Sequence, residues 1–249
     1  HWTGSGASYV HADIHRLVYS PHSNTLWACT DGGASKTTNN GSLWTEKISG
    51  LNIGQIYRFG TSTTTAGKII TGWQDNGTNY YDGLAWRKIL GGDGMECIAD
   101  PSDTNYLYGA LYYGDIRRSS NYGINFSQVA DNGTNGINES GAWVTPYCLQ
   151  EGNSSTMFIG YANVWRSTNV KASSSSSVNW TKISTFGSST LRVIENSPAN
   201  NQIVYAARFY NLRRTDNANA TSPSWTSITL PASCNDLEAH PTNANIVYM

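Results

Sequence analysis

A short polar pattern that ends in an aromatic residue recurs along the chain and is the strongest constraint on its fold. The stretch SSNYGINF (119–126) has this outline, and a short apolar run follows it. Related stretches are TTNNGSLW (37–44), STNVKASSSSSVNW (167–180) and TDNANATSPSW (215–225), with YYDGLAW (80–86) as a shorter version. The closing aromatics are 42, 40, 54 and 45 residues apart: Trp44, Trp86, Phe126, Trp180 and Trp225. A repeat of this period indicates an array of similar structural units.

Each repeat also contains two short apolar segments upstream of its aromatic. The first series is HRLVYSP, QIYRFGT, ECIADPS, WVTPYCL, LRVIENS and LEAHPTN, and the second is NTLWACT, GKIITGW, NYLYGAL, TMFIGYA, QIVYAAR and NIVYM. These segments are rich in Val, Ile, Tyr and Trp and are bounded by turn-forming residues, which is typical of β-strands. Sustained helical periodicity is absent. Each repeat is therefore predicted to contain four antiparallel strands.

Units of about 40–45 residues with four strands are typical of β-propeller blades. We predict an all-β fold, a single β-propeller over 1–249, with blades at about 13–48, 55–89, 96–129, 142–183 and 190–228 and the start of another at 237. A β-sandwich has similar strand spacing, but it does not predict one aromatic at the same phase of five successive units. About five and a half blades leave a ring open, so we expect a longer parent protein with a seven- or eight-bladed ring.

The composition narrows the class of partner. Charged residues make up only 13% of the 249 residues and the net charge is -1, which argues against nucleic-acid binding. No run of 18 apolar residues occurs, so no membrane span is expected in this segment. The 12% of aromatic residues among many Ser, Thr, Asn and Gly is common in secreted and carbohydrate-handling β-proteins.

Four cysteines are far apart in the sequence: Cys29, Cys97, Cys148 and Cys234. Without a C-x-x-C pair they do not indicate a zinc knuckle. Each lies in or beside a predicted core strand, so buried free thiols are favoured slightly over disulfides, and their pairing is left open.

The recurring motif resembles the Asp-box of BNR-repeat propellers, whose pattern is Ser-x-Asp-x-Gly-x-x-Trp. That group includes sialidases, sortilin-like receptors and family-74 xyloglucanases. Here Asn39, Asn121 and Asn169 replace the Asp, and either side chain can cap the turn through its oxygen. The resemblance implies that the motif forms the hairpin between the third and fourth strands of a blade, with a structural role.

A second resemblance covers residues 10–129, from VHADIHRLVYSP to MECIADP and beyond. This region looks like large secreted or surface-anchored bacterial propeller proteins, many of them sortilin-like or glycosyl-hydrolase-like. The resemblance implies export, and hence an extracellular or cell-surface location, with a polysaccharide or protein partner there.

If the motif marks one face of the propeller, the loops at the opposite rim are predicted to bind ligand. Acidic, amide and aromatic residues recur in these loops, and the candidates are His11, Asp13, His15, Trp73, Asp75, Asp93, Tyr112, Tyr113, Asp115, Trp143 and Tyr161. Carboxylates beside aromatic rings suit sugars, because the C–H faces of a sugar stack on rings while its hydroxyls bond to carboxylates. The alternative is that these residues only form turns.

The stretch HADIH has a more specific interpretation. On an extended segment, His11, Asp13 and His15 share one face. Three such ligands could hold a divalent metal. The favoured alternative is a hydrogen-bonded cluster that fixes the first strand, and we predict no cofactor.

Two classes of function remain. The favoured hypothesis is a non-catalytic module that binds glycan or protein partners, or a structural part of a surface assembly. The alternative is a family-74-like endo-glycosidase with paired carboxylates, for which Asp31, Asp75 and Asp93 are the candidates. A sialidase is disfavoured because the arginines lie beside the repeated motif, away from the predicted channel. Nucleophile-elbow, Walker and dinucleotide motifs are absent.

Overall fold

The computed structural model describes residues 8–51 and 54–249. Short antiparallel strands dominate it, and the described residues include only two single-turn 3-10 segments, η1 (Tyr112–Gly114) and η2 (Ser175–Ser177). None of the helical segments in this part of the chain has the length and apolar character needed to cross a bilayer. The chain divides into two compact units, His1–Gln55 and Ile56–Met249.

The first unit holds one four-stranded antiparallel sheet. Its strands follow sequence order: β1 (Ile14–Tyr19), β2 (Leu26–Thr30), β3 (Gly33–Thr37) and β4 (Thr45–Glu46). Every residue of β1 is exposed, whereas Ala28, Ser35 and Thr37 of the two middle strands are buried.

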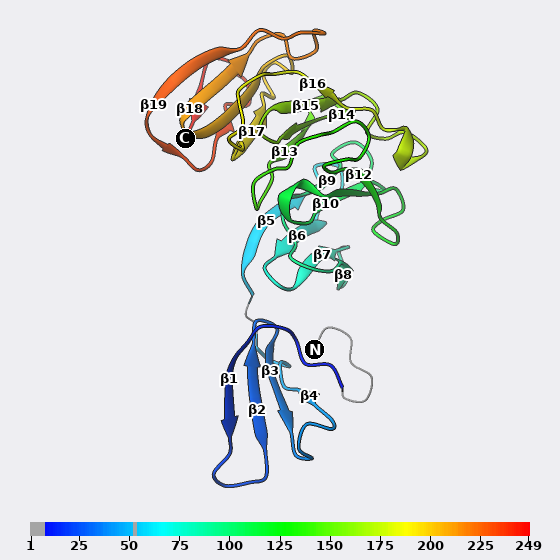
Figure 1. Ribbon diagram of the computed structural model, residues 1–249. Helices are drawn as coiled ribbons and strands as arrows, with labels where there is room; N and C mark the ends of the chain where they lie inside the picture. Colours follow the sequence, from blue (N-terminus) through cyan, green and yellow to red (C-terminus); the bar gives the residue numbers. More distant parts are fainter. Residues whose placement is uncertain (1–7, 52–53) are drawn as a thin grey trace. The chain divides into compact units, whose positions relative to one another are not determined.

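The second unit contains three further four-stranded antiparallel sheets, each again in sequence order (Figure 1). The first consists of β5 (Ile56–Thr61), β6 (Ile69–Trp73), β7 (Gly77–Tyr81) and β8 (Trp86–Leu90). The second consists of β9 (Cys97–Ala99), β10 (Leu107–Ala110), β11 (Ile116–Ser119) and β12 (Ser127–Ala130). The third consists of β13 (Tyr147–Gln150), β14 (Asn153–Gly160), β15 (Val164–Ser167) and β16 (Thr181–Lys182).

The last two sheets are β17 (Val193–Asn196), β18 (Val204–Thr215) and β19 (Thr226–Cys234), then β20 (Glu238–Ala239) and β21 (Val247–Tyr248). The chain reverses direction within β18, as the short distance between its two halves shows. The Arg214 guanidinium lies 5.6 Å from the Tyr205 ring. Nine residues of unbroken strand would span roughly 30 Å. The positive φ of Phe209, 48°, lies between these two residues. β18 therefore supplies both the second and the third strand positions of its sheet.

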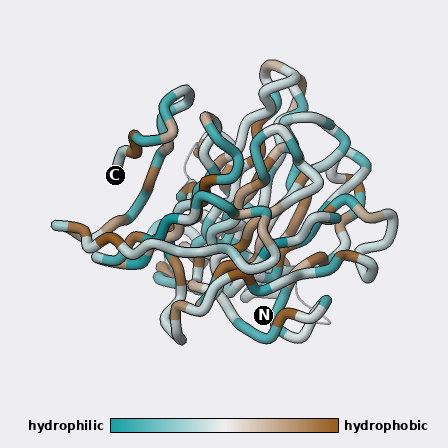
Figure 2. Tube along the Cα trace, turned by 90° about the horizontal axis from the view of Figure 1, so that it is seen from above, coloured by the Kyte–Doolittle hydropathy of each residue, from teal (hydrophilic) through white to brown (hydrophobic). Residues whose placement is uncertain are grey.

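Hydrophobic side chains fill the spaces between successive sheets of this unit. One core joins Tyr108 and Ile116 of the second sheet to Met157 and Ile159 of the third, and another joins Phe158 to Val204 of the next. Hydrophobic and hydrophilic stretches alternate along the trace, as expected for short strands joined by polar turns (Figure 2). The predicted all-β fold with four-stranded antiparallel sheets is confirmed.

The repeated polar motif forms the same hydrogen-bonded turn in four sheets, each time between the third and fourth strand positions. At 119–126, Ser119 Oγ accepts the amide hydrogens of Asn121 (3.2 Å) and Gly123 (2.9 Å), and Asn121 Oδ1 accepts that of Asn125 (3.0 Å). Equivalent pairs are Thr37 with Asn39, Ser167 with Asn169, and Thr215 with Asn217. Short side-chain oxygens thus satisfy turn amides that no strand partner reaches.

The aromatic that closes the motif packs on the preceding sheet in the later repeats. Trp180 Nε1 donates to Val129 O and Trp225 Nε1 donates to Ile183 O, both at 2.8 Å. Phe126 packs against the core that includes Ile70 and Tyr80. Trp86 differs, since it is 52% exposed and packs on Tyr81 of its own sheet with ring centroids 5.4 Å apart. Trp44 belongs to the first unit, where its carbonyl accepts from Ser8 Oγ at 3.3 Å.

Replacing Trp180 with Ala is expected to lower the free energy of unfolding by about 3–5 kcal/mol, because it empties a buried volume and removes one of the two side-chain hydrogen bonds to the Val129 carbonyl. The matched change Trp86→Ala removes a half-exposed ring and is expected to cost about 1 kcal/mol or less. Urea denaturation followed by circular dichroism measures both. Equal losses for the two variants would contradict the inter-sheet role of Trp180.

Candidate functional site

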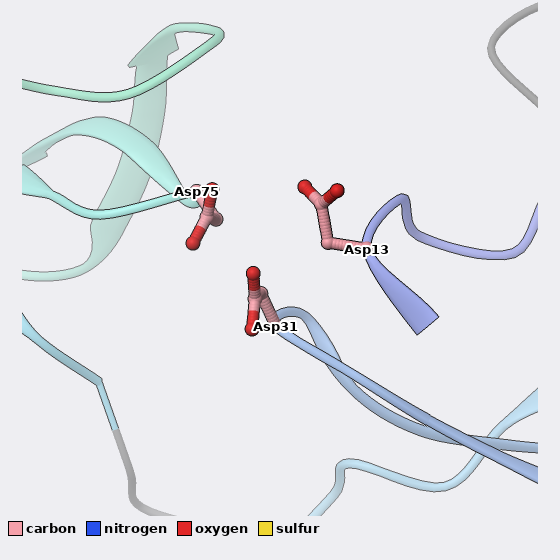
Figure 3. Close-up of side chains that lie close together, drawn as sticks. All are labelled: Asp13, Asp31 and Asp75. Atoms are coloured by element: carbon pink, nitrogen blue, oxygen red, sulfur yellow. The ribbon is translucent and has the colours of Figure 1, made fainter. Parts of the chain in front are cut away.

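In the first unit, the predicted ligands His11, Asp13 and His15 do not share one extended face. Asp13 has a left-handed backbone, φ 57°, and β1 begins only at Ile14 (Figure 3). His15 Nε2 instead binds Asp31 Oδ1, from the turn between β2 and β3. His11 Nδ1 lies 3.1 Å from the Ala12 carbonyl oxygen. The alternation argument fails here because a single residue in the left-handed region reverses the side-chain phase.

In the second unit, Asp75 and Asp93 are part of a turn network. Asp93 Oδ1 accepts the backbone N–H of Asp75 at 2.7 Å, and Asp75 has a left-handed backbone, φ 57°, in the turn after β6 (Figure 3). Trp73 Nε1 donates to Thr71 Oγ1 at 2.6 Å. The Asp93 carboxylate thus caps the chain reversal that carries Asp75.

Two other predicted ligand residues belong to the scaffold. Asp115 forms an ion pair with Arg117 (2.8 Å) and accepts from Gln128 Nε2 (2.9 Å). Tyr161 is fully buried, and its hydroxyl donates to the Gly114 carbonyl at 2.8 Å. The sequence places Tyr161 in the expected loop, but its ring faces the core rather than the rim.

Three predicted residues do come together as an exposed aromatic cluster, defined here as Tyr112, Tyr113 and Trp143. The Tyr112 ring stacks on Trp143 with centroids 5.3 Å apart and planes inclined by 7°. Tyr113 meets both rings edge-on, at 5.9 Å and 5.4 Å. The three residues are 45%, 51% and 42% exposed, in that order. Such a cluster presents large apolar faces to solvent, which marks a candidate interaction site.

Local backbone contacts hold the aromatic cluster in place. Tyr113 lies in η1 with a φ of 62°, an unfavourable conformation for a residue of its size. Its N–H donates to the Trp143 carbonyl (3.3 Å), and its own carbonyl accepts from Gly141 N–H (2.9 Å). Trp143 Nε1 donates to the Tyr57 hydroxyl at 3.3 Å. The rings are therefore fixed before a ligand arrives, which lowers the entropic cost of binding.

A cavity of about 480 Å³ lies among the first strands of the sheets in this unit. Residues of β5, β13, β17 and β20 line it, together with Glu96 just before β9. Six charged residues contribute to its wall: Arg58, Glu96, Arg192, Glu195, Asp236 and Glu238. Tyr57 also lines the cavity, so it touches both the cavity and the aromatic cluster.

Two carboxylates of the cavity wall titrate far from their ordinary range. Burial raises the pKa of Glu96 to about 7, although Arg58 Nε lies 3.3 Å from its carboxylate and opposes the shift. Burial, reinforced by Glu238 and Glu151, raises the pKa of Glu195 to about 8. At neutral pH Glu195 is therefore mostly protonated.

Sequence reasoning missed Glu96 and Glu195 as site residues. Glu96 lies at the end of the segment GGDGME, the loop that also carries the predicted ligand residue Asp93. Glu195 lies in the strand segment LRVIEN, and the available signal is an acidic residue directly after the apolar pair Val193–Ile194 of a first strand.

All four cysteines are free thiols, so the slight preference for thiols over disulfides agrees with the structure. Cys97 and Cys234 are buried, and burial raises the pKa of the Cys97 thiol. Cys148 lines the cavity. Cys29 differs from the expectation because it is exposed, in the first unit.

Arginines of the third strands tie neighbouring sheets together. Arg118 Nη1 donates to the Val170 carbonyl, and Arg166 Nη1 donates to the carbonyls of Ala218 and Ala220 (3.0 Å for Ala220). These guanidinium groups are therefore committed to the scaffold.

No protein-family model matches the chain, and no curated protein matches it either. Solved structures do match. An ancestral GH74 enzyme aligns with a TM-score of 0.57 and 18% identity over 96% of this chain and 34% of that one. The GH74 xyloglucanase from Xanthomonas campestris gives 0.57 and 13% over 95% and 43%. The extracellular domain of a one-component system from B. thetaiotaomicron gives 0.56 and 12% over 95% and 32%.

The fold is propeller-like. At these identities the likeness concerns the fold alone, and the chain spans between about a third and just under half of the length of these three structures.

The buried Glu195 generates a pH-dependent contribution to stability. Its folded-state pKa, about 8, is above the ordinary value of 4.5, so its contribution is complete below about pH 4.5 and is lost as pH rises through about 8. Glu195→Gln mimics the protonated form. The variant is expected to match the wild type in melting temperature at pH 4 and to exceed it at pH 9, as measured by thermal denaturation. The same difference at both pH values would contradict the shifted titration.

Proposed function

We propose that this chain is part of an exported propeller protein that binds glycan through its aromatic cluster. The observation that carries the proposal is the stacked pair Tyr112–Trp143, with Tyr113 edge-on to both and all three side chains exposed. An exposed, pre-organised set of rings matches the C–H faces of sugar rings, while the phenol hydroxyls serve as hydrogen-bond partners at its border. The low net charge of the chain, -1, suits an uncharged polymer better than nucleic acid.

The comparisons support the same proposal. One matched structure is a xyloglucanase and another is the extracellular domain of a one-component system. We propose by extension that the four hydrogen-bonded turns are Asp-boxes with Asn in place of Asp, that the sheets are blades of one larger ring of seven or eight, and that the protein works outside the cell or on its surface.

We favour glycan binding over the alternative, an enzyme that hydrolyses glycosides with a pair of Asp carboxylates. The Asp93 carboxylate already accepts a backbone N–H of its own turn network, and Asp31 binds His15. Carboxylates bound into turns in this way are positioned for structure, whereas a glycosidase needs two that face the scissile bond.

Loss of one ring of the aromatic cluster is expected to weaken glycan binding. Wild type is screened by affinity electrophoresis against β-glucan, xyloglucan, mannan and galactan, and positive ligands are titrated by calorimetry. Trp143→Ala and Tyr112→Ala are each expected to weaken binding by about tenfold or more, since a lost stacking contact of about 1.4 kcal/mol has that effect.

The matched controls are Trp86→Ala and Tyr122→Ala, whose side chains are similarly exposed, at 52% and 44%, but lie outside the cluster. They are expected to bind as the wild type does. Failure of the wild type to bind any polymer of the panel refutes the proposal. Hydrolysis of a polymer that is lost in Asp75→Asn or Asp93→Asn would establish the glycosidase alternative instead.

A further inference from the structure

Tyr57 connects the aromatic cluster with the cavity. Its hydroxyl accepts a hydrogen bond from Trp143 Nε1 at 3.3 Å, and the same side chain lines the cavity next to Arg58 and Phe59. A chain-like ligand that stacks on Trp143 therefore lies close to a side chain of the cavity wall. The cluster and the cavity can act as one extended site.

The cavity offers polar groups without a large net charge. The wall contains two arginines, Arg58 and Arg192, and four carboxyl groups, those of Glu96, Glu195, Asp236 and Glu238. With Glu195 mostly protonated and Glu96 close to half-protonated at pH 7, positive and negative charges nearly balance. A wall of this kind presents both hydrogen-bond donors and acceptors, which suits a ligand that is rich in hydroxyls and uncharged.

The size of the cavity suits a ligand of the same kind. Its volume of about 480 Å³ lies within the usual range for small-molecule sites, about 300–1,000 Å³. The wall comes from strands rather than from long loops, so the cavity is formed before a ligand enters. Apolar faces are present too, from Phe59, Pro146 and Val193.

We propose that this cavity takes one uncharged sugar unit of the glycan whose neighbouring units lie on the aromatic cluster. The inference rests on the proposed function, because the cluster supplies the main contact and the cavity adds a second subsite. Arg192 and Glu195, which both line the cavity, are the hydrogen-bond partners for the hydroxyls of that unit.

The test uses neutral oligosaccharides of two to six units made from the polymer that binds, with hydrogen–deuterium exchange as the readout of location. Contact with the cluster is expected to protect the amides of 111–115 and 141–144. Occupation of the cavity is expected to protect those of 192–195 and 236–239 as well. Protection of the first pair of segments alone overturns the cavity proposal and leaves the proposed function standing.

A cavity-filling variant gives a second measurement. Cys148→Phe replaces the small thiol that lines the cavity with a large aromatic ring, which takes up part of the cavity volume. The variant is expected to weaken binding by about tenfold or more and to remove the protection of 192–195 while that of 111–115 remains. Cys29→Phe is the matched control, because Cys29 is exposed in the other unit, and it is expected to bind as the wild type does.

A conservative variant covers the case in which Cys148→Phe does not fold. Glu195 lies near Glu238 and Glu151, which disfavour its ionised form. An uncharged ligand that fills the cavity takes water away from the Glu195 carboxylate, so it binds less well when Glu195 is ionised. Wild-type affinity is therefore expected to fall between pH 6 and pH 9, and that of Glu195→Gln to fall less, because one of the two cavity carboxyls that titrate in this range is gone. If the affinities of wild type and Glu195→Gln change with pH in parallel, the cavity proposal is overturned. If the wild type binds no oligosaccharide at any pH, both proposals are overturned.

Discussion

The whole structure depends on a small hydrogen-bonded turn and the aromatic ring that follows it. A Ser or Thr oxygen and an Asn oxygen satisfy the amides of the turn, as Ser119 and Asn121 do. The turn then places a ring against the preceding sheet, where Trp180 and Trp225 each donate to a carbonyl of that sheet. A local rule of this kind, repeated, orders short strands that would be unstable as isolated hairpins.

Much of this follows from the sequence, because the rule is local. The spacing of Trp44, Phe126, Trp180 and Trp225 predicts repeated four-stranded sheets, and short apolar runs predict where strands lie. The prediction is less accurate where one residue changes the backbone. Asp13 in the left-handed region breaks the alternation expected between His11 and His15. Trp86 has the right position in the repeat, yet packs on its own sheet.

The candidate site is predictable only in part for a related reason. The sequence predicts Tyr112, Tyr113 and Trp143 in loops of one rim, and the structure brings these three rings together. Tyr161 belongs to the same type of loop, but its direction depends on packing around Gly114, which no sequence pattern specifies. The cavity carboxylates Glu96 and Glu195 owe their unusual titration to burial among five sheets, a property of the assembled unit.

Each sheet of the larger unit contributes only its first strand, or the residues beside it, to the cavity wall. The residues of the wall therefore come from separate, similar segments of the chain. Exchanging one first strand for a homologous one would change only the lining residues that this strand supplies, and it would leave the aromatic rings between the sheets in place. In such an architecture the lining of the cavity can change one strand at a time, with little effect on the stability of the fold.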